Sequence, residues 1–143
     1  MKKLFLILLI LSSCGTGNKK NNPIEGIFTL DFQSNFSKDS TTLFINDCLI
    51  FENVILESDK IDGVTNMSIE LKQHKNSGVI VDINGKEQIT CKGAVKPLRL
   101  KIIVNQVVNN LYLDLERGKY IGFDKTFENK LKLNQSYYPF EYD

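Results

Sequence analysis

The sequence has no tryptophan and a single histidine. One histidine excludes a metal site built from several imidazoles, and a Ser-His-Asp or Cys-His catalytic arrangement could use only His74. His74 lies in the polar stretch 72–78, which is typical of a solvated surface residue. The sequence also lacks a P-loop, a dinucleotide-binding fingerprint, a G-x-S-x-G turn and an EF-hand loop. We therefore expect a protein that is not an enzyme and that holds no metal and no cofactor.

An excess of either charge is also missing. The chain has 18 Lys and Arg residues against 17 Asp and Glu, a formal charge of +1. Removing Lys2 and Lys3 leaves 16 basic and 17 acidic residues, so the rest carries about −1. Binding to phosphate backbones or to anionic lipid needs a net basic surface. The charge balance argues against nucleic acid as the main partner and against general attraction to anionic membranes.

No apolar run approaches the ~20 residues that span a bilayer as a helix. The stretch from Leu4 to Leu11 is unbroken but only eight residues long, and it follows the basic start Met1-Lys2-Lys3. Its length and flanks fit a secretory signal peptide. The residues Leu11-Ser12-Ser13-Cys14 come directly after it.

This tetrapeptide resembles the bacterial lipobox, [LVI]-[ASTVI]-[GAS]-C. The resemblance implies that the Cys14 thiol takes a diacylglycerol and that the chain is cut before Cys14. Each buried methylene contributes about 0.8 kcal/mol, so two or three acyl chains anchor a protein stably. Gly15 in place of Asp implies the outer membrane, on its periplasmic face or at the cell surface. The alternative is an ordinary signal peptide followed by a free Cys14.

Three segments follow from this interpretation. Residues 1–13 are a lipoprotein signal peptide, and residues 14–23 are a flexible tether of Gly, Asn and Lys residues. Residues 24–143 form a single domain, which is long enough to bury its own core.

Apolar and polar residues alternate along most of this domain, which indicates strands with one buried and one wet face. The alternation covers 28–32, 67–72, 98–104, 111–116 and 130–133, and the denser apolar stretch 42–57 predicts one or two central strands. Turn signals recur every 8–12 residues. The expected fold is therefore all-β, an antiparallel β-sandwich or small barrel of about 8–10 short strands.

Two hairpin turns are expected from glycine dipeptides. Asn84-Gly85 lies between 79–81 and Ile89, and either a two-residue or a three-residue loop fits. The three-residue loop 84–86 places Val79, Val81, Ile83, Ile89 and Cys91 on one face, so we favour it on burial. Arg117-Gly118 is expected to join 111–116 to 120–123 as a second hairpin.

Three cysteines are present, and lipidation of Cys14 leaves Cys48 and Cys91. An even pair in an oxidising compartment predicts a disulfide. The alternative is two buried reduced thiols, since cysteine packs as a small hydrophobe.

Two groups of residues are candidates for a partner surface. Lys92, Lys96, Arg99 and Lys101 form a basic run, which either solvates a strand face or meets an acidic partner. All five tyrosines lie in the last 32 residues, and Tyr137 and Tyr138 suit a binding surface. The favoured interpretation of these rings is a C-terminal strand, 135–142, pinned to the core at a sheet edge because it contains Pro139.

The carboxylate pairs Asp59/Asp62, in a turn, and Asp114/Glu116, outward on a strand, are interpreted as solvated. The run 118–143 is similar to the ends of small envelope lipoproteins of Gram-negative bacteria, a resemblance that implies no activity. The sequence therefore predicts a lipid-anchored, non-enzymatic envelope β-domain that binds a protein or a small ligand. The alternative is a periplasmic inhibitor or immunity lipoprotein directed against a toxin or hydrolase.

Overall fold

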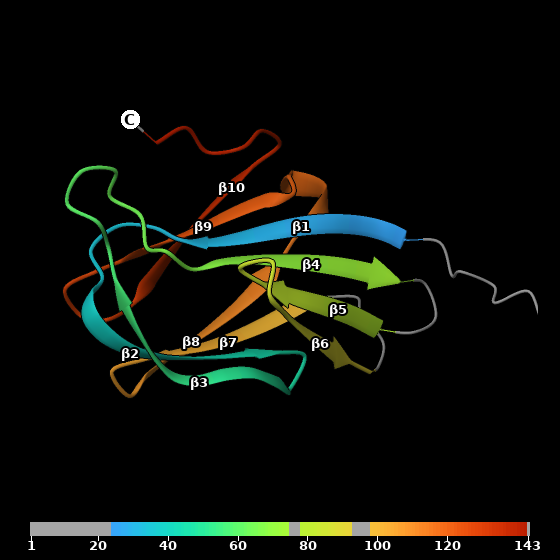
Figure 1. The fold of residues 1–143 in the computed structure, drawn as a ribbon, viewed down its shortest axis with the longest axis horizontal. Coiled ribbons are helices and arrows are strands. Elements are labelled where there is room, and N and C mark those ends of the chain that lie inside the picture. Colours follow the sequence, from blue (N-terminus) through green and yellow to red (C-terminus); the bar gives the residue numbers. More distant parts are fainter. Residues whose placement is uncertain (1–23, 75–77, 93–97, 143) are drawn as a thin grey trace, which may run out of the picture.

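The computed structural model describes residues 24–74, 78–92 and 98–142, which form two β-sheets packed face to face (Figure 1). Their strands are β1 (Ile24–Phe32), β2 (Ser37–Ile45), β3 (Cys48–Glu57), β4 (Ser68–His74), β5 (Gly78–Ile83), β6 (Glu87–Cys91), β7 (Leu98–Val104), β8 (Val107–Leu113), β9 (Tyr120–Lys125) and β10 (Leu131–Ser136). A short 3₁₀ helix, η1 (Leu115–Arg117), lies between β8 and β9.

The two sheets differ in size and both have open edges. The larger has the order β10-β9-β1-β4-β5-β6, and the smaller has the order β3-β2-β7-β8. Neighbouring strands run antiparallel except β1 and β9, which are parallel. The expected all-β sandwich is confirmed, whereas the barrel alternative is wrong because the sheets do not close.

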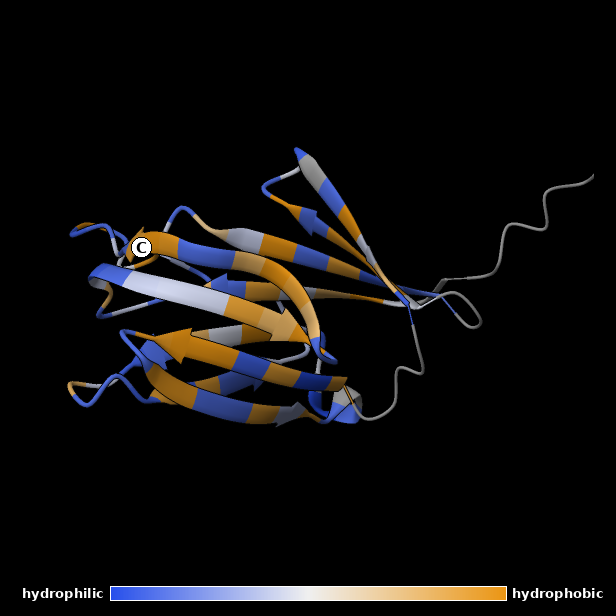
Figure 2. Cartoon of the chain, turned by 90° about the horizontal axis from the view of Figure 1, so that it is seen from below, coloured by the Kyte–Doolittle hydropathy of each residue, from blue (hydrophilic) through white to orange (hydrophobic). Residues whose placement is uncertain are grey.

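The apolar residues of the alternating strands fill the space between the sheets. Figure 2 shows hydrophilic and hydrophobic residues following one another along the strands. Leu30 and Phe32 of β1 are fully buried, and so are Ile102 and Val104 of β7. The Phe32 ring lies 5.4 Å from that of Phe123, and the rings of Phe36 and Phe51 meet its other sides edge-on. An aromatic cluster from both sheets therefore forms the centre of the core.

Tight turns join the antiparallel pairs. The loop Asn84–Lys86 between β5 and β6 has three residues, as expected, with Ile83 paired to Glu87. Asn46-Asp47 and Asn105-Gln106 make two-residue turns with positive φ at both positions, the type I′ geometry that matches the twist of paired strands. These two turns lack glycine, and the sequence interpretation missed them.

The expected hairpin at Arg117-Gly118 is wrong. β8 ends at Leu113 in the smaller sheet and β9 begins at Tyr120 in the larger one, so this segment crosses between sheets. Asp114 does not lie on a strand either, because it caps η1 by accepting a hydrogen bond from the backbone N–H of Glu116. Gly118 has φ of 130°, and a Cβ there would lie 2.2 Å from the Ser136 carbonyl oxygen. Glycine is required here because another strand passes close by, not because the chain reverses.

Two further expectations need correction. The stretch 42–57 divides into β2, which is central, and β3, which is an edge strand that leaves Leu49 and Ile55 exposed. The C-terminal strand ends at Ser136 instead of reaching Tyr142, and Tyr137 and Tyr138 are exposed rather than pinned to the core. β10 is an edge strand as expected, but Pro139 lies beyond it.

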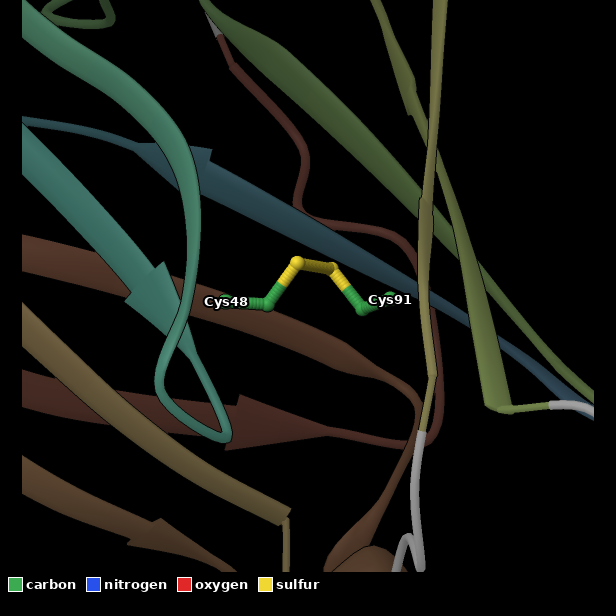
Figure 3. Close-up of a disulfide and its surroundings, with 2 residues drawn as sticks. All are labelled: Cys48 and Cys91. Atoms are coloured by element: carbon green, nitrogen blue, oxygen red, sulfur yellow. A yellow bond between two sulfur atoms is a disulfide. The ribbon is translucent and has the colours of Figure 1, made fainter.

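Cys48 and Cys91 form the predicted disulfide, with Cα atoms 5.8 Å apart (Figure 3). Cys48 begins β3 and Cys91 ends β6, so the bridge joins edge strands of the two different sheets. The disulfide therefore holds the sheets together along one side of the sandwich.

A buried ion pair links the sheets at another point. The Lys125 ammonium of β9 lies 3.3 Å from the Asp39 carboxylate of β2, and both side chains are almost fully buried. Asp39 also accepts hydrogen bonds from the Ser37 backbone N–H and the Asn105 amide. These partners compensate the cost of burying the two charges.

Within the described ranges, no helix is long and apolar enough to cross a membrane. The predicted signal peptide, Cys14 and the tether lie outside the described residues.

Candidate binding surface

The described residues were compared first with the requirements of a metal site. Among them, no group of three or more His, Cys, Asp or Glu side chains is placed to hold a metal ion. His74 is half-buried at the end of β4, so the expectation of a solvated loop residue needs that adjustment. Asp59 and Asp62 bind backbone N–H groups within their own turn, and Asp114 caps η1.

The outer face of the smaller sheet is where exposed and half-buried apolar, aromatic and basic side chains meet. Strand register places them in rows across β3, β2, β7 and β8. One row runs Leu49, Phe44, Lys101 and Asn110, a second runs Thr42, Ile103 and Val108, and a third pairs Arg99 with Tyr112. We call Phe44, Leu49, Arg99, Lys101, Ile103, Val108 and Tyr112 the basic–aromatic face.

Lys101 lies at the centre of this face. Its ammonium is 3.9 Å from the centroid of the Phe44 ring, a cation–π contact that holds the charge over the neighbouring strand. Lys101 is half-buried, since its stem covers apolar surface while the charge stays outside the core. The sheet therefore presents a positive charge directly beside an aromatic ring.

Arg99 is held less firmly. Its guanidinium lies 3.0 Å from the carboxylate of Asp47 in the β2–β3 turn, and both side chains are well exposed. Beside them, Asp47, Arg99, Lys101 and Tyr112 line a small hollow of about 90 Å³. An exposed pair of this kind is worth about 0–1 kcal/mol, so a competing carboxylate can replace Asp47 at little cost.

A larger hollow of about 440 Å³ adjoins Phe44 and Ile103 on the same face. Its other walls are polar and come from β2, β3 and the β7–β8 turn: Ser40, Thr42, Glu52, Asn53, Asn105 and Gln106. Glu52 places a negative charge on the β3 side, so the positive charge of the face is concentrated over β7. The surface is therefore polar along one border and basic with aromatic rings along the other.

Only some of the residues predicted to form a partner surface lie together in the structure. Arg99 and Lys101 share one face of β7, as alternation indicates. Lys92 is exposed directly after Cys91, and Lys96 lies outside the described residues.

Tyr137 and Tyr138 follow β10 in the other sheet, so they do not extend the β7 rows. The Tyr137 hydroxyl instead donates to the Glu116 carbonyl of η1.

Five members of the basic–aromatic face escaped the sequence interpretation: Phe44, Leu49, Ile103, Val108 and Tyr112. Phe44 and Leu49 lie in the dense apolar stretch that we interpreted as one or two central strands. The position of β3 at the sheet edge leaves Leu49 exposed, and the outer side of β2 leaves Phe44 half-buried. The available signal was the Asn46-Asp47 turn, which fixes Phe44 opposite Leu49.

The outer face of the larger sheet carries a polar cluster of a different kind. Tyr142, near the C-terminus, accepts a hydrogen bond from the Gln33 side chain at 3.0 Å and donates one to Asp31. Burial raises the pKa of Asp31 above its ordinary value, although hydrogen bonds from Ser68 and Tyr142 oppose the rise. Burial and the nearby Asp31 carboxylate also raise the pKa of Tyr142.

Asp124 stands in the same cluster with the opposite shift. Burial acts to raise its pKa, but hydrogen bonds donated by Ser34 and Asn134 outweigh burial, so the pKa of Asp124 is lowered. Every group of this cluster has partners within the chain, which indicates a role in holding the C-terminal segment. The basic–aromatic face remains the better candidate for binding.

Comparison with models of protein families, with curated proteins and with solved structures found no match to this chain.

Proposed function

We propose that this chain is a lipid-anchored, non-enzymatic envelope protein that binds a protein partner through the basic–aromatic face. The observation that carries the proposal is the Lys101 ammonium fixed over the Phe44 ring, with Arg99 and Tyr112 exposed beside it. Arg and Tyr are enriched where proteins bind one another, because they combine contact area with polar groups. The complementary partner surface carries carboxylates surrounded by apolar side chains.

A protein partner is favoured over a small ligand because the side chains of the basic–aromatic face spread over four strands. The hollows on this face are open and partly polar, whereas small-molecule sites enclose most of their ligand. Cys14 would attach the domain to the outer membrane, and residues 14–23 would separate it from the lipid. The proposal of an anchor rests on the lipobox resemblance alone.

The anchor is tested by growing cells with labelled palmitate. Label is expected in the wild-type chain, and Cys14→Ser should abolish labelling and leave an uncleaved precursor. Labelling that survives Cys14→Ser would contradict the anchor.

The binding surface is tested by capture from the native envelope with Lys101→Glu. Charge reversal at this position places like charges against an acidic partner, so recovery of a specific partner should fall about tenfold or more. The matched control is Lys119→Glu, because Lys119 also lies over an aromatic ring, 5.4 Å from the Tyr120 centroid, on the other sheet. Recovery is quantified from membranes solubilised at low and high salt, since salt weakens exposed ion pairs.

Equal recovery with the wild type and Lys101→Glu, or an equal loss with both variants, would remove the basic–aromatic face as the binding site. The partner's own activity then defines the biological role. A captured toxin or hydrolase would make the chain an inhibitor or immunity lipoprotein.

A further inference from the structure

The edge strand β8 lacks the features that normally keep sheet edges from pairing. Residues 107–113 include no charged residue and no proline, and the strand pairs with β7 over seven residues with no bulge. Long, flat, uncharged edges are templates for another strand, and most proteins interrupt them.

The other three sheet edges are protected or short. β3 has irregular register beside β2 and carries exposed Glu52 and Glu57. β6 is five residues long and ends at the disulfide, and β10 carries exposed Lys132. Among the described strands, β8 is therefore the edge best suited to accept another strand.

The β7–β8 turn determines which backbone groups of β8 are available. Asn105-Gln106 is a two-residue turn, so Val104 and Val107 face each other as a hydrogen-bonded pair. Hydrogen-bonded and non-hydrogen-bonded pairs alternate along an antiparallel ladder. The N–H and C=O groups of Val108, Asn110 and Tyr112 therefore point away from β7, toward the open edge.

β8 is also held in place before any partner arrives. The buried Asn109 side chain accepts a hydrogen bond from the Leu131 N–H at 2.9 Å and donates one to the Asn129 carbonyl at 3.1 Å. These bonds tie β8 to the β9–β10 turn in the other sheet. A strand that is already ordered loses little conformational freedom when it pairs.

We infer that β8 pairs antiparallel with β8 of a second copy of this chain, centred on Asn110. In this register Asn110 faces Asn110 of the second copy, and Val108 faces Tyr112. These three positions are the ones whose backbone groups point outward, so each facing pair exchanges two N–H···O bonds.

The sequence of β8 complements itself in this register. Val108 and Tyr112 are 53% and 65% exposed, and each would cover the other as an aromatic and β-branched cross-strand pair. The uncharged strand brings no like charges together, whereas a charged peptide would find no countercharge on β8 itself. The contact is small, so we expect a dimer with an affinity on the order of micromolar or weaker. It depends neither on the lipid anchor nor on the acidic partner.

Cysteine cross-linking tests both the dimer and its register. Facing residues in a hydrogen-bonded antiparallel pair have Cα atoms about 5.5 Å apart, within the range that a disulfide spans. The full chain carrying Cys14→Ser, purified in a nonionic detergent, is oxidised as three variants: Val108→Cys, Asn110→Cys and Tyr112→Cys.

Asn110→Cys alone should form a covalent dimer. Val108→Cys and Tyr112→Cys should cross-link only when mixed, because each lies about 14 Å from its own copy. Covalent dimers of Val108→Cys or Tyr112→Cys alone would contradict this register, and absence of every cross-link would contradict the dimer.

Sedimentation velocity supplies a second test that does not depend on cysteine. Asn110→Pro removes an outward N–H and none of the bonds to β7, so the domain should stay folded and sediment as a monomer. The unchanged chain should show a dimer at concentrations near 100 μM, on the scale of a micromolar affinity. A dimer that persists in folded Asn110→Pro, or a wild type that remains monomeric up to about 1 mM, would overturn the inference.

Discussion

Two aspartates show how single residues of the same type take opposite roles on one surface. Asp31 and Asp124 both lie on the outer side of the larger sheet, near Gln33 and Tyr142. Burial dominates at Asp31, whereas donated hydrogen bonds prevail at Asp124. The two carboxylates therefore contribute to stability with opposite dependence on pH.

At pH 7 we expect Asp31→Asn to raise the free energy of unfolding. The pKa of Asp31 is raised in the folded state. The protonated Asp31 carboxyl therefore adds stability at pH values below its ordinary pKa, and this stability is lost as the pH rises through the folded-state pKa. The amide removes that loss, so the difference from the wild type should shrink toward pH 3. Urea unfolding at both pH values measures it.

Asp124→Asn should instead lower the free energy of unfolding at pH 7. Because the pKa of Asp124 is lowered in the folded state, its ionised carboxylate adds stability at pH values above the ordinary pKa, and this stability is lost as the pH falls through the folded-state pKa. Changes of the same sign in both variants at pH 7 would contradict the two environments described here.

At the level of elements, the hairpin turns show where the chain departs from its most favourable residues. Gln106 has φ of 72° in the β7–β8 turn, a left-handed conformation that glycine adopts more easily. Asn-Gly is the preferred pair for this turn type, and the chain places Asn105 at its first position.

Gln106→Gly should therefore stabilise the domain by about 1 kcal/mol. The matched control is Gln88→Gly in the extended strand β6, which should destabilise by about 0.5–1 kcal/mol. Chemical denaturation of the two variants, compared with the wild type, gives the signs directly. A loss of stability with Gln106→Gly would show that the Gln106 side chain makes a contribution larger than the conformational cost.

Some strands and turns were predicted correctly from the sequence, and others were not. Period-two alternation located β1, β4 and β7 correctly, because each buries one face against the core. The hairpin predicted at Arg117-Gly118 was wrong, because a glycine turn signal does not distinguish a hairpin from a crossing between sheets. Likewise, the dense apolar residues of Thr42–Glu57 predicted strands, but they did not predict that β3 lies at a sheet edge. Strand order depends on pairings between segments that are distant in the sequence.

For the candidate surface, alternation placed Arg99 and Lys101 on one face, while the rings around them depended on cross-strand register. The polar cluster around Tyr142 could not be predicted from the sequence, because its partner Gln33 is 109 residues away. Counting cysteines identified the disulfide partners, but not that they belong to different sheets.

At the scale of the whole molecule, the two sheets are joined by a disulfide as well as by the apolar core. The Cys48–Cys91 bridge links their edge strands, and its cysteines are 43 residues apart. Replacing both with serine should lower the free energy of unfolding by about 4 kcal/mol on the chain-entropy model.

Urea unfolding of the double variant measures this loss, with the reduced wild type as the control that keeps the same side chains. Thiol titration of the denatured, unreduced chain should find neither Cys48 nor Cys91 free. Two free thiols, or equal stability with and without the bridge, would contradict its structural role.

The disulfide also determines what happens when a protease cuts the domain. Between β3 and β4, the turn at Asp59–Gly63 leaves Ile61 91% exposed, which makes it an accessible cleavage point. Because this turn lies between Cys48 and Cys91, one cut there opens a covalent ring without releasing either fragment. The two pieces remain joined, and each keeps strands in both sheets. A domain cut at this exposed turn would thus remain one molecule.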